Sequence, residues 1–550
     1  MADTVTALAD ELVDVVLTEF PLEASVLRIG TEPDRLGDPS PAQTAWLRAR
    51  YLDIGARADA IDEAGVTGRS RITRALIKHE AASRVDLIDA AVLEFTATDF
   101  FVSPAAYLLF AMPGLPVDTP ELADAYLARL AAIPAHLAAV ADRHRAGTEA
   151  GRPLVRRLAE AAIRQLRDNT ADLLRRTPPD ASARFLARQE ELISGAVRPA
   201  FAAYRAALTG LLPAARSDEH AGVCWLPDGE ATYAKLVRLH TTTDRTAQDL
   251  HDTGLAIIEG LAQEYRELGA RVFGTADLAG IFTHLREDSA LRWESPQQVL
   301  DTARTALDRA TEAAPDWFGV LARERCEVRP TPPDAAASAI PMYYQVPALD
   351  GSRPGIYFAN TANVTERSRT IAEATAFHEG VPGHHFQHAL MAELTDLPLL
   401  HKLANATAYV EGWGLYSERL ADEMGLYSDD IARLGMLVYD SMRAGRLVVD
   451  TGMHALGWSR QRAVDYLRTH TPMTVSEIGT EIDRYLGYPG QALAYMVGRL
   501  EIQRLRAHAS TALGSAFDLR RFHDVVLGNG RLPLSILDGV VGDWITRSGH

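Results

Sequence analysis

Apolar residues recur every three or four positions through most of the first 330 residues of the chain. This is the period of an amphipathic helix, which turns one apolar face toward a core. Ala, Leu, Arg and Glu, which favour helices, dominate the same stretch. The pattern predicts long helices at Ala42–Ile61, Ser70–Leu93, Leu122–His144, Leu154–Leu174 and Ala181–Leu212, and another that follows the capping residues Thr241–Asp244 and runs to Leu268.

The pattern changes near residue 330. Val328–Ala335 is rich in proline, and it is followed by two short runs of branched and aromatic residues, Ile340–Pro347 and Ile356–Ala359. Such runs favour strands, and the residues Asp350-Gly351-Ser352 between them favour a turn. We therefore predict a small hairpin or sheet at this place. Helical patterns resume after it and continue to the C-terminus.

These elements predict a mainly α protein, a large multi-helical body with a deep cleft and a small β-hairpin or sheet next to the active-site helix. The chain has 550 residues, of which 47% are hydrophobic, enough for a large core. We expect residues 1–330 to form a helical lobe that is one wall of the cleft. Residues 331–550 would form a lobe with the metal site, continuous with the first as one structural unit.

Composition excludes several classes of protein. The formal net charge of −17 argues against nucleic-acid binding. No run of roughly 18 uncharged apolar residues is present, so we expect no membrane span. The N-terminal stretch carries acidic residues where a secretory signal would be basic and then apolar. The sequence is compatible with a homodimer.

The chain has two cysteines, Cys224 and Cys326, which are far apart in the sequence. Any metal must therefore be held by histidine and carboxylate side chains. Low cysteine content is typical of a reducing compartment, and we expect a cytoplasmic location.

Candidate chemistry is concentrated in one segment, AFHEGVPGHHFQHAL, at Ala376–Leu390. A glutamate directly after a first histidine, with further histidines close behind, is typical of zinc hydrolases. The usual zinc helix has its two histidines four residues apart, but here the residue four after His378 is Pro382. His378 and His384 are six residues apart, which on a straight helix separates them by roughly 120° and about 9 Å.

Residues Gly380–Gly383 offer a way around this spacing. Pro382 cannot donate the helical hydrogen bond to residue 378, and the glycines permit unusual backbone angles. If two residues bulge out, His384 takes the place of the second ligand beside His378. The rival pair is His384 and His388, which have true four-residue spacing but leave His378 and Glu379 without a role. We expect His385 and His388 to lie outside the ligand set.

Glu411 is the candidate for a third ligand. It lies 27 residues beyond His384, enough for the first helix to end and an antiparallel helix to return. Its neighbours Tyr409, Val410 and Trp413 are apolar, and a buried carboxylate needs a positive partner, which is either a metal or an ion pair. Glu418, two turns further on, is the weaker candidate.

Several segments together resemble the bacterial family of unknown function DUF885. They are HEGVPGHHFQ, EGWGLYSE, YYQVPALDGSRPGIYFANT, RAGRLVVDTGMHALGWS and YPGQALAYMVGR, and the resemblance covers most of the chain. The family is itself similar to helical zinc metallopeptidases of the gluzincin type. That similarity implies His378, His384 and Glu411 as ligands and Glu379 as general base. It also implies a nearby oxyanion donor, for which Tyr488 is the first candidate and Tyr495 the second.

Other polar residues are candidates for lining the site. Arg446, Asp450 and His454 are spaced four apart on one face of a helix, which indicates either a surface pair or a row that lines the cleft. In the latter case Asp450 and His454 would support the metal ligands. Arg443 or Arg446 would hold a substrate carboxylate in a fork. Asn360, after a predicted edge strand, would bind substrate backbone by strand addition.

The leading hypothesis is a zinc-dependent hydrolase that cleaves a peptide or other amide bond in a small peptide or small molecule. Glu379 would activate a metal-bound water, and Tyr488 would stabilise the oxyanion. Two histidines and one carboxylate also describe the facial triad of non-haem Fe²⁺ enzymes, and other divalent metals fit as well. A third hypothesis is a binding protein with a structural metal, although such sites are usually closed by four ligands.

Overall fold

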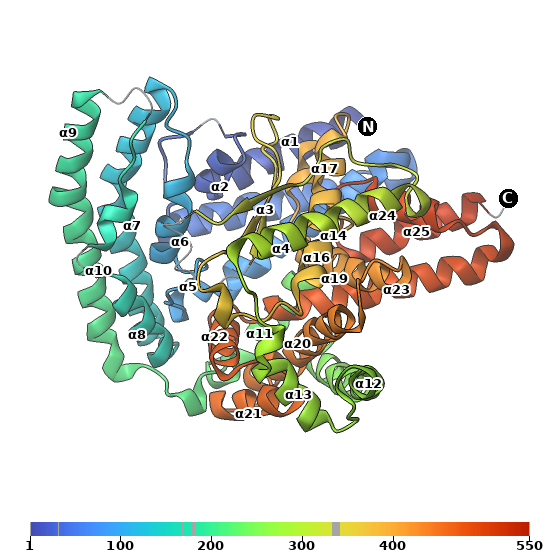
Figure 1. Cartoon of the computed structure of the whole chain (residues 1–550). Coiled ribbons are helices and arrows are strands. Elements are labelled where there is room, and N and C mark those ends of the chain that lie inside the picture. The colour runs from blue at the N-terminus through green and yellow to red at the C-terminus, as the bar shows by residue number, and fades with distance from the viewer. Residues whose placement is uncertain (1, 31, 168, 179–181, 333–341, 549–550) are drawn as a thin grey trace. The chain divides into compact units, whose positions relative to one another are not determined.

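The computed structural model describes residues 2–548 except residues 31, 168, 179–181 and 333–341 (Figure 1). The described residues form a mainly α protein with a small three-stranded sheet, which confirms the predicted fold class. None of the described helices is both long and apolar enough to cross a lipid bilayer. The deep cleft stays a prediction.

The described chain divides into two compact units. The first contains Met1–Leu236, Met453–Arg462 and Ile482–Pro489, and the second contains the remaining residues. The main division between these units falls after Leu236. The lobes predicted from the sequence, residues 1–330 and 331–550, stay a prediction.

In the first unit, the predicted helical period corresponds to α-helices with buried apolar faces, and several of them pack around an apolar core. Leu130, Ile133 and Val140 of α7 are fully buried in that core. Thr119 accepts a hydrogen bond from the Leu122 N–H and Pro120 takes the first helical position, so α7 begins where its sequence predicts. The helices are α1 (Ala2–Glu19), α2 (Pro21–Val26), α3 (Pro41–Asp59), α4 (Gly68–Ala90), α5 (Val92–Phe95), α6 (Pro104–Ala111), α7 (Pro120–Glu149), α8 (Arg156–Gln165), α9 (Ala183–Leu192), α10 (Arg198–Leu211) and α11 (Gly229–Thr241), the last of which ends in the second unit.

The second unit holds the remaining helices and the sheet. Three of its helices, α20, α21 and α22, continue into or out of the first unit. The helices are α12 (Ala247–Phe273), α13 (Leu278–Glu287), α14 (Pro296–Trp317), α16 (Ala372–Glu379), α17 (His384–Glu393), α18 (Leu399–Leu403), α19 (Thr407–Glu423), α20 (Asp430–His454), α21 (Arg460–His470), α22 (Val475–Gly487), α23 (Ala494–Leu513), α24 (Leu519–Leu527) and α25 (Leu534–Ser548).

The sheet has the strand order β1-β3-β2. β2 (Met342–Gln345) pairs antiparallel with β3 (Ile356–Ala359), which confirms the predicted hairpin; Ile340 and Pro341 lie outside the described residues. β1 (Glu327–Pro330) pairs parallel with the other side of β3. β3 is therefore the central strand, and the expectation of an edge strand before Asn360 was wrong.

Asn360 has a local structural role that follows from this position. Its side chain is 2% exposed and its Oδ1 accepts a hydrogen bond from the Ala362 N–H at 3.0 Å. Strand addition at β3 is blocked because both of its edges are already paired. The predicted contact of Asn360 with substrate backbone required a free strand edge, and β3 has none.

His454 also differs from its predicted role. It is fully buried, its Nδ1 accepts a hydrogen bond from the Val223 N–H at 3.1 Å, and its Nε2–H donates to the Tyr485 carbonyl at 3.1 Å. All three residues belong to the first unit. Both ring nitrogens are thus used by backbone groups, and the row of Arg446, Asp450 and His454 does not act as one set.

These bonds predict a pH-dependent contribution of His454 to stability. Burial lowers the pKa of His454 to about 3, below the value near 6.5 of an unfolded histidine. The unfolded chain therefore takes up the proton first, and the contribution is complete above pH 6.5 and falls by about 1.4 kcal/mol per unit as pH drops toward 3. His454→Phe should lower the free energy of unfolding by about 2 kcal/mol or more at pH 7.5, because it leaves two backbone groups unpaired.

Urea unfolding at pH 7.5, 6 and 5 measures this effect. The difference between wild type and His454→Phe should shrink as pH falls, whereas the exposed His508→Ala should match wild type throughout. A difference that does not change with pH would contradict the assignment of a neutral, buried His454.

Candidate metal centre

The segment Gly380–Gly383 separates two helices. α16 ends at Glu379 and α17 begins at His384, and the backbone angles of Gly380 and Gly383 are not helical. The Val381–Pro382 peptide bond is cis. A Cβ at Gly383 would collide with the His378 carbonyl oxygen, so only glycine fits there. The chain thus bulges where the sequence predicts.

The bulge brings His378 and His384 together. Their ring centroids are 4.6 Å apart and the ring planes are nearly perpendicular, at 81°. The ring of His388 lies 6.1 Å from that of His384. Among the described residues, His378 and His384 form a group with Glu411 in which the three possible ligand atoms lie within 4.8 Å of one another, and His388 is not part of it.

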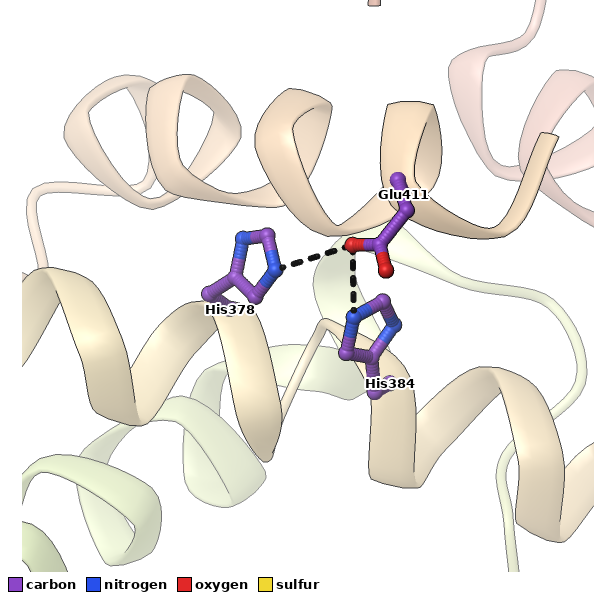
Figure 2. Close-up of side chains that lie close together, drawn as sticks. All are labelled: His378, His384 and Glu411. Atoms are coloured by element: carbon purple, nitrogen blue, oxygen red, sulfur yellow. Dashed lines mark ion pairs between the residues drawn. The ribbon is translucent and has the colours of Figure 1, made fainter. Parts of the chain in front are cut away.

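Glu411 reaches both histidines from α19. Figure 2 shows its carboxylate beside both imidazoles, with one oxygen facing both rings. That oxygen, Oε2, lies 3.6 Å from His378 Nε2 and 3.4 Å from His384 Nε2. These distances exceed ordinary hydrogen bonds, which are about 2.7–3.2 Å. They match ligands around a tetrahedral zinc ion, which are roughly 3.3–3.5 Å apart when each bond is about 2.0–2.1 Å.

α19 also fixes the bulge itself. The indole N–H of Trp413 donates to the Pro382 carbonyl at 2.8 Å, and the Ser417 hydroxyl donates to the same oxygen at 3.3 Å. Trp413 is fully buried. A Cβ at Gly414 would lie 2.7 Å from His378 Cε1, so a glycine lets α19 approach the imidazole. The third candidate ligand and the bulge are therefore positioned by the same helix.

Glu418 orients His378 from the other side. Its carboxylate is fully buried, and its Oε1 accepts a hydrogen bond from His378 Nδ1 at 2.8 Å. This bond leaves Nε2 directed at Glu411. A carboxylate behind a metal-binding histidine is a recurrent arrangement that fixes the ring and its tautomer. Glu418, which the sequence indicated only as a weaker ligand candidate, is thus the partner of a candidate ligand.

The electrostatics of the cluster favour a positive charge at its centre. Burial alone would lower the pKa of His378, but the carboxylates of Glu411 and Glu418 raise it to about 9. Burial would likewise raise the pKa of Glu411, but the two histidines hold it well below its usual value. The residues therefore fit a cation, by donor type and by spacing.

Glu379, the last residue of α16, lies at the edge of this cluster. It is half-buried, and its charge is one of the influences that raise the pKa of His378. Burial is the largest cause of the raised pKa of Tyr344 on β2 and of Tyr439 on α20. The charge of Glu379 makes a smaller contribution in the same direction. Its carboxylate is thus within electrostatic reach of the candidate ligands and of the sheet.

Tyr495 and the two arginines gather on one side of the cluster. The Tyr495 ring is stacked on that of His378, with 6.5 Å between centroids. The guanidinium carbons of Arg446 and Arg443 lie 4.5 and 5.8 Å from the Tyr495 centroid. Arg446 also pairs with Glu481 at 2.9 Å. The structure therefore brings these three predicted residues together.

Three other predicted residues have different positions. The His385 Nε2–H donates to the Glu324 carbonyl at 2.9 Å, and its Nδ1 accepts from the Tyr344 hydroxyl at 3.2 Å, so His385 ties α17 to β2. Asp450 accepts a hydrogen bond from the Gly490 N–H at 3.1 Å. Tyr488 belongs to the first unit, and its role as an oxyanion donor stays a prediction.

Sequence reasoning missed Gly414 and Tyr439. Gly414 follows Glu411 by three residues and Tyr439 precedes Arg443 by four, which are spacings that place each pair on one helix face. A helical projection around Glu411 and Arg443 would have placed Gly414 and Tyr439 next to these predicted site residues.

Comparison with known proteins gives three findings. The chain has no match among curated proteins. A solved structure described as the "putative lipoprotein from Colwellia psychrerythraea" has a TM-score of 0.89 and 25% identity, with 99% of each chain covered. A "putative lipoprotein of unknown function from Shewanella oneidensis" has a TM-score of 0.76 and 18% identity over 97% of this chain and 98% of that one, a likeness of fold.

The model of a family described as bacterial protein of unknown function, DUF885, matches residues 21–541. The chain is therefore a member of the DUF885 family.

Proposed function

We propose that the protein is a zinc-dependent hydrolase that cleaves a peptide or other amide bond. The observation that carries this proposal is the spacing of 3.4 and 3.6 Å between the Glu411 oxygen and the two imidazole nitrogens. Because His378 Nδ1 is taken by Glu418, Nε2 is the ring nitrogen that faces the Glu411 oxygen. The carboxylates of Glu411 and Glu418 raise the pKa of His378 to about 9, so a proton occupies Nε2 when no metal is bound, and a zinc ion would replace that proton.

The chemistry needs a base beside the cation, and Glu379 supplies it. A zinc ion held by His378, His384 and Glu411 would lower the pKa of a bound water. Glu379 would take a proton from that water as the water oxygen forms a bond with the amide carbon. Glu379 would then deliver the proton to the leaving nitrogen as the carbon–nitrogen bond breaks. Tyr488 remains the donor favoured by the sequence, and Tyr495 is the one supported by proximity to His378.

The alternative is non-haem iron chemistry on a small metabolite at the same two-histidine, one-glutamate site. Glu379 favours hydrolysis, because a carboxylate next to the first ligand is a base that an oxygenase does not need. A structural site is disfavoured because the described cluster offers three ligands rather than the usual four.

The cellular setting is a separate question. The solved relatives are called putative lipoproteins, a name that points to the cell envelope for those proteins. The cytoplasmic location, the homodimer and the lack of nucleic-acid and membrane partners stay predictions for this chain.

The ligand assignment predicts the metal content of variants. Wild type, stripped with a chelator and then dialysed against equimolar Zn²⁺ and Fe²⁺ without oxygen, should retain one zinc ion per chain by mass spectrometry. His384→Ala and Glu411→Ala should retain little, because each removes a ligand. Glu418→Gln should keep the stoichiometry but bind zinc about 10–100-fold more weakly in competition with a chromophoric chelator.

The exposed His508→Ala is the control and should bind zinc as wild type does. Undiminished zinc in both ligand variants would rule out this site, and retention of iron rather than zinc would favour the alternative chemistry.

The base assignment predicts the behaviour of Glu379→Gln. The variant should keep its zinc but lose roughly 10²–10⁴-fold in kcat/KM, because it cannot accept the proton. A fluorogenic library of short peptides and aryl amides provides the assay, and the exposed Glu366→Gln provides the control. If Glu379→Gln turned over substrate at the wild-type rate, Glu379 would not be the base.

A further inference from the structure

Arg443 on α20 is a buried guanidinium without an anionic partner among the described residues. Arg443 is 6% exposed, and its Nε and Nη1 have no hydrogen-bond acceptor among the residues that the structure describes. Other buried arginines of the second unit differ. Arg446 pairs with Glu481, and Arg499 pairs with Asp440. Because an unpaired buried charge is costly, a guanidinium left in this state is poised for an external anion.

Two aromatic rings hold the guanidinium in place. Its carbon lies 4.0 Å from the centroid of Tyr439 and 5.8 Å from that of Tyr495. Such contacts stabilise a cation through the ring faces and use none of its N–H groups. Nε and Nη1 each form a planar fork with Nη2, and either fork matches the two oxygens of a carboxylate.

The same rings connect Arg443 to the candidate metal centre. Tyr495 is stacked on His378 at 6.5 Å, and the Tyr439 hydroxyl is 2.7 Å from Thr375 Oγ1 on α16. Since one extended residue spans about 3.5 Å, the guanidinium is no more than about four residues of extended chain away from the His378 ring. Tyr439, Tyr495, Glu379 and Glu411 are all half-buried, so solvent reaches the groups around Arg443.

We propose that Arg443 binds a free carboxylate of the substrate, and that the enzyme therefore cleaves amide bonds close to a free carboxyl terminus. This inference rests on the proposed hydrolase function and narrows its substrate class. The substrate carboxylate forms the ion pair that Arg443 lacks. Because Arg443 lies only a few residues of extended chain from the candidate metal centre, the bond that is cleaved lies within a few residues of the carboxyl terminus. Substrates whose terminus is amidated lose the ion pair and leave the guanidinium unpaired.

Matched substrates test the specificity. A series of N-blocked peptides places the free carboxylate one, two or three residues beyond the scissile bond, and each has an amidated twin. Wild type should cleave at least one acid with a kcat/KM at least 100-fold above that of its twin, mainly through a lower KM. Equal cleavage of acids and amides would overturn the proposal without any variant.

Variants then assign the preference to Arg443. Arg443→Met should remove the preference by lowering kcat/KM for the acid about 100-fold and leaving the amide unchanged. Arg443→Lys should restore part of it, because it keeps the charge but not the fork. Arg433→Met, on the same helix but paired with Asp422 at the surface, is the control and should keep the preference. An equal fall in kcat for acid and amide, with KM unchanged, would place Arg443 at the reacting carbonyl and overturn the proposal.

Binding to chelator-treated protein separates this inference from the proposed function. Calorimetry with N-acetylphenylalanine and its amide, without any metal to attract the carboxylate, should show at least tenfold tighter binding of the acid to wild type, a smaller difference with Arg443→Lys and no difference with Arg443→Met. If no substrate is cleaved but this difference is found, the hydrolase function fails and the carboxylate site stands. If hydrolysis is found but the acid and the amide bind equally, the carboxylate site fails.

Discussion

The close packing of α19 against the bulge between α16 and α17 is the constraint on which the candidate site depends. The three candidate ligands, His378, His384 and Glu411, come from three different helices. No single helix therefore sets the distances between them. The Trp413 indole holds the bulge through the Pro382 carbonyl, and Gly414 lets the helix approach His378. Ligand geometry is thus a property of tertiary packing.

Charge is arranged in two complementary places. At the centre, the carboxylates of Glu411 and Glu418 flank His378 and favour a cation. At the side, Arg443 lies between aromatic rings and favours an anion. Tyr495 lies between the two places and contacts both. A substrate with an amide carbonyl oxygen near the cation and a carboxylate near Arg443 matches this arrangement. The proposed hydrolase function and the proposed carboxylate site therefore support each other.

Much of the fold could be predicted because local patterns specify it: helical period, the hairpin turn, and the proline and glycines that interrupt the histidine segment. The failures involve contacts between distant residues. β1 pairs with β3 from the other side of the hairpin, so nothing near Asn360 marks β3 as central. His454 follows Arg446 and Asp450 at helical spacing, yet its partners Val223 and Tyr485 are known only from the folded chain. The pairing of Glu418 with His378 is equally invisible in the sequence.

The dependence of the bulge on α19 has a consequence for biosynthesis. Pro382 is translated some thirty residues before Trp413, so the histidine segment leaves the ribosome before the helix that shapes it. Before α19 docks, the histidine segment lacks both the third candidate ligand, Glu411, and the Trp413 contact to Pro382. The proposed metal site would therefore be complete only late in maturation, after the chain has been synthesised beyond α19.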